Sequence, residues 1–421
     1  MRWLRARGSL LFENEILLVV CTSTLLVMLG QGITAPTLPL FAKTFGVSTA
    51  AVGLTLSVFA GARMLVNLPA GIAADRWGRR FLLIGGPLLA GAGALLSATA
   101  TSLETLLVWR FVAGVGSALY MTGAAIVVTD IATDANRGRL LAVNQGALLL
   151  GVTLGPAIGG VLAALAGLRA PFVLVGIAAL AAAVWNYFRV PETMPGDIAP
   201  ARPAGAPAEA RGSGWSAALT LLLSVNFALI SLVTVSVFFA RAGRQTILPL
   251  FARDEIGLGE AGIGGVFALM ALLNLLLVIP AGALFDRYGA RAAIVPSAVV
   301  NALAFWLIGA SSGALAFVAA TVVLGLGSGI LGPAPAAYAA AIAPPDRRGV
   351  AMGLFRTVGD VGFVVAPPLV GFLADEAGFD WGFLVMGGML LIAALLFGLR
   401  GGRSHTPGPR IAVEPAAAPP A

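Results

Sequence analysis

The sequence contains few charged residues, one cysteine and one histidine. Only 11% of its 421 residues are charged, whereas a soluble domain typically carries about 25%. Because 59% of the residues are hydrophobic, most of the surface must face lipid rather than water. Cys21 alone cannot form an intrachain disulfide or a cysteine-rich metal site. His405 alone, in a polar tail, excludes a histidine-based metal centre or a Ser-His-Asp triad in the core.

Sequence patterns of enzymes and of nucleic-acid-binding proteins are also missing. No phosphate-cradling Walker loop is present, and the glycine-rich stretch 325–329 follows an apolar run rather than a strand, so we interpret it as packing. The net charge of +7 does not indicate nucleic acid, because the basic residues separate apolar runs and do not cluster with stacking aromatics. We therefore predict no enzyme, no cofactor, no metal and no nucleic-acid partner.

Twelve apolar runs, each long enough to cross a bilayer, follow one another along the chain. They lie at about 13–41, 49–72, 81–101, 105–129, 140–165, 171–189, 217–251, 260–284, 291–311, 313–341, 350–373 and 380–399. A stretch rich in Pro, Ala and Gly separates the first six from the last six, and a Pro-rich polar tail follows the last. We predict an all-α membrane protein with a six-helix bundle over 1–189, a linker over 190–214, a second six-helix bundle over 215–400 and a disordered tail over 401–421.

Basic residues are distributed very unevenly between the two sides of this topology. Eighteen of the 26 Lys and Arg residues lie in segments on the side of the termini, and only Lys43, Arg169 and Arg253 lie in loops on the other side. The positive-inside rule therefore predicts a multi-pass protein of the plasma membrane with both termini in the cytoplasm. A composition rich in Ala, Gly and Arg, with a single lysine, indicates a bacterial source.

The two halves repeat one another at an offset of 210 or 211 residues. Residues 38–43 (LPLFAK) match 248–253 (LPLFAR), residues 71–80 (GIAADRWGRR) match 282–291 (GALFDRYGAR), and Pro156 matches Pro367. Because both halves begin on the same side, they are parallel repeats related by an axis along the membrane normal. A substrate site is expected between such repeats, near the middle of the membrane.

The repeated loop after the second span combines glycine, aspartate and arginine. Glycines allow close helix approach and unusual dihedrals, while the aspartate can face a helix N-terminus and the arginines can form ion pairs between bundles. We expect a gating role for both copies, and we predict that the first copy stabilises the outward-open state. The residues are Gly71, Asp75, Arg76, Gly78, Arg79 and Arg80 in the first copy, and Gly282, Asp286, Arg287, Gly289 and Arg291 in the second.

This loop resembles the motif between helices 2 and 3 of the major facilitator superfamily. Residues 29–39 (LGQGITAPTLP), 110–116 (RFVAGVG) and 151–160 (GVTLGPAIGG) resemble motifs in helices 1, 4 and 5 of its twelve-helix drug-proton antiporters, the multidrug efflux group. The resemblance covers about residues 12–400 and implies two six-helix bundles that rock about a central cavity. The sequence departs from the family pattern at Ala142, where a glycine is usual, and it has no acid deep in the first span.

The resemblance also implies roles for individual residues. In the family, an acid at the end of helix 4 pairs with an arginine of the loop motif, which corresponds here to Asp130 and Arg79. Gly155 and Pro156 of the helix-5 motif correspond to a hinge or a seal against leakage. Simple close packing of small residues is the alternative for these two positions.

Ionisable residues inside the spans are costly and are therefore candidates for function. Asp360 is the only acid well inside a span, and Arg356 lies one turn earlier on the same helical face, so the two form either a structural ion pair or a titrating or substrate-binding pair. Arg63 is expected to face inward. Arg110, Arg241 and Arg244 either face the cavity or extend to outer water. The uncharged candidates for the cavity wall, which could instead join helices, are Gln31, Tyr120, Gln145 and Asn274.

Together these features predict a monomeric secondary active transporter that works by alternating access. Proton-coupled efflux of amphipathic small molecules is the first hypothesis, with the proton and the lipid bilayer as the other partners. Uptake or symport of an anionic metabolite is the second, because arginines outnumber acids inside the spans. A non-transporting receptor or scaffold is an alternative of another class, against which the duplicated gating loop argues.

Overall fold

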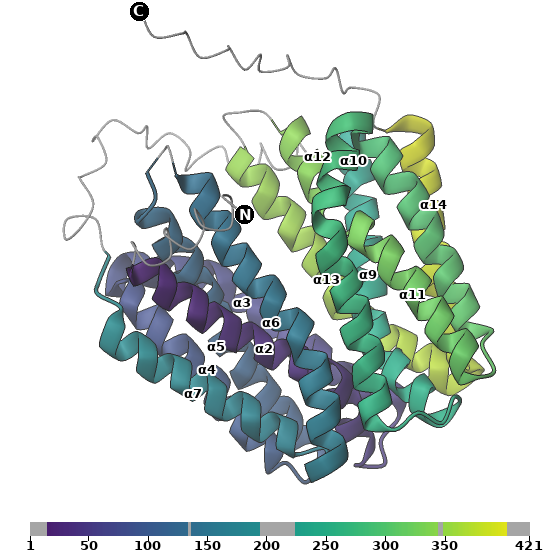
Figure 1. Cartoon of the computed structure of the whole chain (residues 1–421), viewed down its shortest axis with the longest axis horizontal. Helices are drawn as coiled ribbons and strands as arrows, with labels where there is room; N and C mark the ends of the chain where they lie inside the picture. The colour runs from purple at the N-terminus through teal and green to yellow at the C-terminus, as the bar shows by residue number, and fades with distance from the viewer. Residues whose placement is uncertain (1–14, 134–135, 194–223, 344–347, 402–421) are drawn as a thin grey trace, which may run out of the picture.

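The computed structural model describes residues 15–133, 136–193, 224–343 and 348–401, and these residues form helices joined by short turns, with no strand among them (Figure 1). The helices are α2 (Glu15–Lys43), α3 (Thr49–Trp77), α4 (Arg79–Ala98), α5 (Leu103–Asp130), α6 (Arg137–Ala166), α7 (Ala170–Arg189), α9 (Val225–Asp254), α10 (Glu260–Gly309), α11 (Ala314–Leu331), α12 (Ala334–Ile342), α13 (Arg348–Ala377) and α14 (Phe379–Arg400).

Eleven helical stretches in the described residues are long and apolar enough to cross a membrane. One of them, α10, has 50 residues and bends at Gly289, so it crosses twice, while α11 and α12 together form one stretch. The predicted all-α fold with twelve crossings is therefore confirmed, and the chain is a multi-pass membrane protein. We call α2–α7 the N-half and α9–α14 the C-half.

The turns repeat between the halves as closely as the helices do. The glycines with positive φ in the described residues are Gly46, Gly78, Gly167, Gly257, Gly289 and Gly378. They form three pairs, and the members of each pair are separated by the same offset of 211 residues that the sequence predicts. Because a side chain is strained in this left-handed region, each pair places the same tight reversal at the same point of both halves.

Crossings alternate in direction, so the molecule has two ends. The terminal end is the one at which α2 begins and α14 ends, and the distal end is the opposite one. The helices of the two halves meet toward the distal end and diverge toward the terminal end (Figure 1). The largest buried apolar cluster shows the same arrangement, because it joins C-half residues to N-half residues such as Phe41, Val52 and Phe172, which all lie toward the distal ends of their helices.

Close backbone contacts between helices depend on small residues. A Cβ at Gly155 of α6 would lie 2.6 Å from the backbone nitrogen of Ile33 in α2, and a Cβ at Gly151 would lie 2.8 Å from the backbone nitrogen of Leu29. In lipid no hydrophobic force pulls helices together, so association depends on such close packing. The α6 glycines therefore hold α6 directly against α2.

Candidate substrate cavity and gating elements

A cavity of about 670 Å³ lies between the halves and is lined by helices of both. Its volume is within the range of drug-sized ligand sites. Most of the wall is apolar, with side chains such as Leu56, Phe59, Phe267, Met270 and Phe363. The polar and charged part of the wall comprises Gln31, Thr34, Arg63, Arg110, Ser117, Gln145, Arg241, Arg244, Gln245, Asn274, Asn301, Ser328 and Asp360.

Much of the polar wall comes from positions that the internal repeat relates. Gln31 and Arg241 lie 210 residues apart, as do Thr34 and Arg244, and all four line the cavity. Arg63 and Asn274, 211 residues apart, also both line it. The same helical positions thus face the cavity in each half, but the C-half positions on the first helix carry arginine where the N-half carries uncharged residues.

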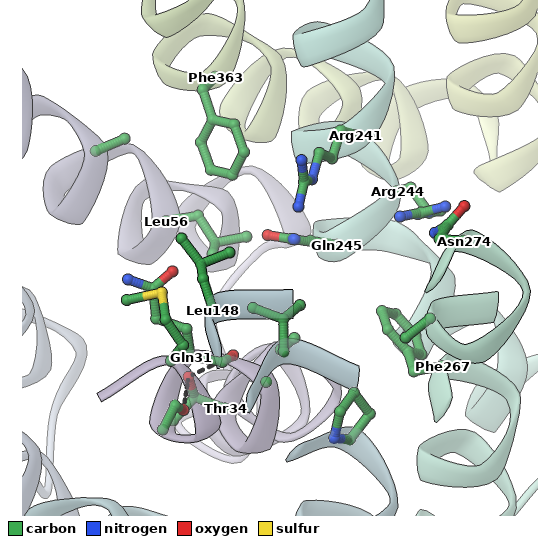
Figure 2. Close-up of a pocket in the computed structure, with 18 of the residues that line it drawn as sticks. Gln31, Thr34, Leu56, Leu148, Arg241, Arg244, Gln245, Phe267, Asn274 and Phe363 are labelled. Carbon is green, nitrogen blue, oxygen red and sulfur yellow. Dashed lines mark hydrogen bonds between the residues drawn. The ribbon is translucent and has the colours of Figure 1, made fainter. Parts of the chain in front are cut away.

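Arg110, Arg241 and Arg244 face the cavity rather than outer water. Arg110 is only 8% exposed, its guanidinium lies 4.3 Å from the centre of the Phe59 ring, and its Nε donates a 3.4 Å hydrogen bond to the carbonyl of Thr55. Figure 2 shows Arg241 and Gln245 pointing into the space between the halves, and Arg244 lying beside Asn274. Extension to outer water, the alternative from the sequence, does not describe these three side chains.

Asp360 lines the cavity and interacts electrostatically with Arg356, but the predicted close ion pair between them is not formed. The two residues form no ion pair within 4.0 Å in the described chain, and the Arg356 side chain is exposed and lies outside the cavity wall. One helical turn separates them, which is enough to place Arg356 nearer the terminal end. Arg63, on α3 of the other half, interacts electrostatically with Asp360 and lines the same cavity. Asp360 therefore interacts with Arg63 across the cavity and with Arg356 on its own helix, and forms a close ion pair with neither in the described residues.

Tyr120 was a candidate either for the cavity wall or for a contact between helices, and the structure shows the contact between helices. Its ring is fully buried within the N-half, where its hydroxyl donates a 3.0 Å hydrogen bond to the carbonyl of Val20 and lies 2.9 Å from the hydroxyl of Thr24. The helical spacing that predicted a cavity position fits a contact between α5 and α2 equally well. Gln31 does line the cavity, and its amide donates a 3.1 Å hydrogen bond to Ser117.

Several polar atoms in and around the cavity wall have no partner. The Nε atoms of Arg63 and Arg244 and the Oδ1 atom of Asn274 are buried and form no hydrogen bond with the described residues. Buried polar groups are usually satisfied, so these atoms are available to a ligand or to water. No group of three or more His, Cys, Asp or Glu residues in the described chain could hold a metal ion.

The distal end of the cavity is sealed by α3 against α13. The carboxylate of Asp375 in α13 accepts backbone hydrogen bonds from Thr49 and Ala50 at the start of α3, both at 2.8 Å. Further in, the hydroxyl of Ser57 donates a 2.6 Å hydrogen bond to the carbonyl of Val364. An acid at a helix N-terminus satisfies free N–H groups and complements the helix dipole. Here the cap and the helix belong to different halves.

A second distal seam, between α6 and α10, repeats the first. A Cβ at Gly160 would lie 2.6 Å from the Cα of Gly264, so the two backbones touch. Gly160 and Gly264 correspond, at the offset of 211, to Gly371 and Gly53 in the first seam. Position 164, the counterpart of Asp375, is alanine, so only one seam carries an acidic cap. Pro156, predicted to form a hinge or seal, lines the cavity one turn before Gly160.

The first loop motif is organised by contacts within the N-half. Arg79 is buried, and its Nε lies 3.1 Å from the Asp130 carboxylate, which confirms the pairing that the family resemblance implies. The Arg80 guanidinium donates to the carbonyl of Tyr187 at 2.7 Å, and Gly78 supplies the reversal with a φ of 90°. The structure places Arg76 on the surface and Gly71 within α3. The Asp75 side chain lies outside the described part of the structure.

Glu192 is a member of this network that the sequence did not predict. Its carboxylate accepts the backbone N–H of Arg79 at 2.8 Å and that of Arg80 at 3.3 Å, so it caps α4. The sequence places Glu192 in the predicted linker, because Pro and Gly follow it. Glu192 follows the end of α7 by three residues, and α7 ends beside the first loop motif. An acid at that point of the sequence was the signal that could have indicated a cap for α4.

The second loop motif is open by comparison. Gly289 forms the same reversal as Gly78, with a φ of 80°. Asp286, Arg287 and Arg291 are exposed, and Gly282 has open space around it. The counterparts of Arg79 and Asp130 are Ala290 and Ala341, so the ion pair has no equivalent here.

The arrangement of two six-helix halves around a central cavity defines a membrane transporter fold. The family profile of the Major Facilitator Superfamily matches residues 20–240 and 230–420, so the chain belongs to this family. It is therefore a transporter and not an enzyme.

Named relatives agree with this assignment. Multidrug resistance protein 2 of Bacillus subtilis is 23% identical over 90% of this chain and 94% of its own length. The uncharacterized MFS-type transporter MJ1560 of Methanocaldococcus jannaschii is 27% identical over 86% of this chain and 91% of its own. A bacterial homologue of the human lysosomal transporter Spinster, solved in an inward-facing and unoccupied conformation, superposes with a TM-score of 0.81 at 17% identity, covering 91% and 96% of the two chains. The resemblance to the multidrug efflux group is thus shown.

Proposed function

We propose that this transporter exports amphipathic small molecules from the cytoplasm by alternating access, coupled to proton entry. The observation that carries the proposal is the central cavity, which combines a mostly apolar wall with a few charged and polar groups. Such a wall suits molecules with an apolar body and one polar group. The relatives named as multidrug resistance proteins support export.

The proposed orientation places the terminal end in the cytoplasm, on the basis of the basic residues counted above. The conformation is then inward-open, because the hydrogen bonds between the halves lie toward the distal end in the described residues. A substrate could enter the cavity from the cytoplasm in this state. Export would require the distal seams to open while the loop motifs bring the terminal ends together.

Asp360 is the proposed site of proton coupling, since it is the only carboxylate that the described residues contribute to the cavity wall. Protonation of Asp360 would remove the negative charge that faces Arg63, which would change the balance of charge between the halves. Proton and substrate occupancy would then be linked through one site.

Transport into proteoliposomes under an imposed proton gradient tests the proposal. A panel of amphipathic fluorescent compounds should move against their own gradient when protons move in the opposite direction. Uptake by symport, the second candidate, would appear as movement in the same direction as the protons. An absence of transport for the whole panel, with correctly oriented protein, would support the receptor or scaffold alternative.

A further inference from the structure

We infer that the cavity selects organic anions with an apolar body, and that Arg241 and Arg244 bind the anionic group; this inference rests on the proposed transport function. Among the described residues, the cavity wall contains four arginines, namely Arg63, Arg110, Arg241 and Arg244, and one acid, Asp360, with no Lys, Glu or His. The formal charge of this described part of the wall is therefore +3.

The four arginines are not equally available to a ligand. Arg63 interacts electrostatically with Asp360, the acid in the described part of the wall. Arg110 is 8% exposed, packs on the ring of Phe59 and donates to the carbonyl of Thr55, so its guanidinium is already engaged. Arg241 and Arg244 have no carboxylate partner in the described residues.

Arg241 and Arg244 are positioned to act on the same group. They lie three residues apart on α9 and interact with one another electrostatically. Figure 2 shows Arg241 directed into the cavity, with Gln245 nearby and Arg244 beside Asn274. The Nε of Arg244 is buried without a hydrogen-bond partner among the described residues, while its Nη1 lies 3.9 Å from the sulfur of Met270. Carboxylates, sulfonates and phosphates match the planar fork of guanidinium donors.

The apolar part of the wall lies next to these two arginines. Phe267, Met270 and Phe363 line the same cavity from α10 and α13, as Figure 2 shows for the two phenylalanines. An anionic group at Arg241 and Arg244 would therefore leave its apolar body against this surface. A cationic amphipath of the same shape would meet like charge at the same point.

Closure of the cavity favours a bound anion. In the open state water can hydrate Arg241 and Arg244, but the transition between states removes much of this water. Two neighbouring cations without a counter-ion are costly in a dry environment. A bound anion compensates them, so the loaded transporter can close more readily than the empty one.

Three probes with one apolar body test the charge preference. Pyrenebutyrate, pyrenebutanol and pyrenebutylamine are an anion, a neutral molecule and a cation, and their fluorescence reports binding to the full chain in nanodiscs of zwitterionic lipid. Empty nanodiscs correct for partition into lipid. The expected Kd for the butyrate is about 10- to 100-fold lower than that for the alcohol, as expected for charge-assisted hydrogen bonds, with the amine weaker still.

Variants locate the site. R241Q and R244Q should each weaken butyrate binding by about tenfold or more and leave alcohol binding unchanged, while R241K should retain much of the preference. R253Q is the matched control, because Arg253 lies at the distal end of α9, pairs with Asp254 and is outside the cavity wall. It should leave all three affinities unchanged.

The outcomes separate this inference from the proposed function. Equal or tighter binding of the amine by the unmodified protein overturns the anion preference, and it needs no variant to fold. An equal loss for all three probes in R241Q and R244Q overturns the assigned site. If the amine or the alcohol binds best and is transported, the anion preference fails but the proposed transport function stands. If none of the three probes is bound or transported, the result counts against both the anion preference and the proposed function.

Discussion

The carboxylate of Asp375 accepts the backbone N–H of Thr49 at 2.8 Å, although the two residues belong to opposite halves. Lys43, near the end of α2, donates a 3.2 Å hydrogen bond to the hydroxyl of the same Thr49. A movement that opens the distal end must separate Asp375 from the start of α3. The contact therefore stabilises the state seen here relative to one in which the distal end is open.

Asp375→Ala should shift the population toward the outward-open state. Loss of a helix N-cap costs about 0.5–2 kcal/mol, and because the cap exists in only one state, the equilibrium should change by roughly 2- to 30-fold. Distances between spin labels on α3 and α13 at the distal end would report the change. Asp254→Ala is the control, because that acid pairs with the adjacent Arg253 within its own half. Unchanged distance distributions in Asp375→Ala would show that the cap does not hold the seam.

Gly264→Ala should impair closure of the second distal seam. A Cβ at Gly264 would lie 2.6 Å from both the Cα of Gly160 and the carbonyl oxygen of Pro156, so the backbones must separate. Gly265→Ala is a matched control, because a Cβ at Gly265 would meet no atom within 4 Å. We expect increased outward-facing accessibility and reduced transport only for Gly264→Ala. Equal effects of the two substitutions would contradict the role of this contact.

Asp130→Asn should lower thermal stability, because it removes the negative charge that lies 3.1 Å from the buried guanidinium of Arg79. The expected loss is about 2 kcal/mol, below that of a fully buried pair, since Asp130 is partly exposed. Arg79→Ala combined with Asp130→Ala reproduces the residues of the second copy, Ala290 and Ala341. The double variant should be less destabilised than the sum of the two alanine variants, as thermal unfolding in detergent would show. Additive losses would mean that the two side chains do not interact.

Asp360→Asn should abolish gradient-driven transport but leave substrate exchange measurable, because the cavity would lose the one carboxylate in the described part of its wall while keeping its shape. Asp360→Glu should keep some activity with a changed pH dependence. Asp380→Asn, in the first turn of α14 and outside the cavity wall, is the control and should transport normally. Full uphill transport by Asp360→Asn would place proton coupling elsewhere.

The sequence predicted the features that depend on the lengths and spacings of segments along the chain. Hydrophobic run length determined the twelve crossings, and the offset of 211 residues determined which turns repeat, as Gly78 and Gly289 show. The pair Arg79 and Asp130 could be predicted because the family resemblance supplied the partner. These predictions needed no knowledge of how the helices rotate about their axes.

The sequence could not predict the features that depend on how each helix is rotated about its own axis. Tyr120 and Arg110 lie on the same helix, yet one is buried against α2 and the other lines the cavity. Arg356 and Asp360 are one turn apart, yet only Asp360 lines the cavity. Asp375 and Glu192 each cap a helix that is distant in sequence, and spacing along the chain does not reveal such contacts.

Alternating access of the cavity is most directly tested by labelling one residue from each side of the membrane. Gln245 lines the cavity and points into it, so Gln245→Cys, with Cys21→Ser to remove the native thiol, places one reactive group there (Figure 2). An impermeant thiol reagent should label it from the cytoplasmic side, and Asp375→Ala should increase labelling from the outside while decreasing labelling from the cytoplasm. Labelling from the outside alone would contradict the inward-open assignment. Equal labelling from both sides, unchanged by any distal substitution, would contradict alternating access. Such a result would indicate a continuous pore.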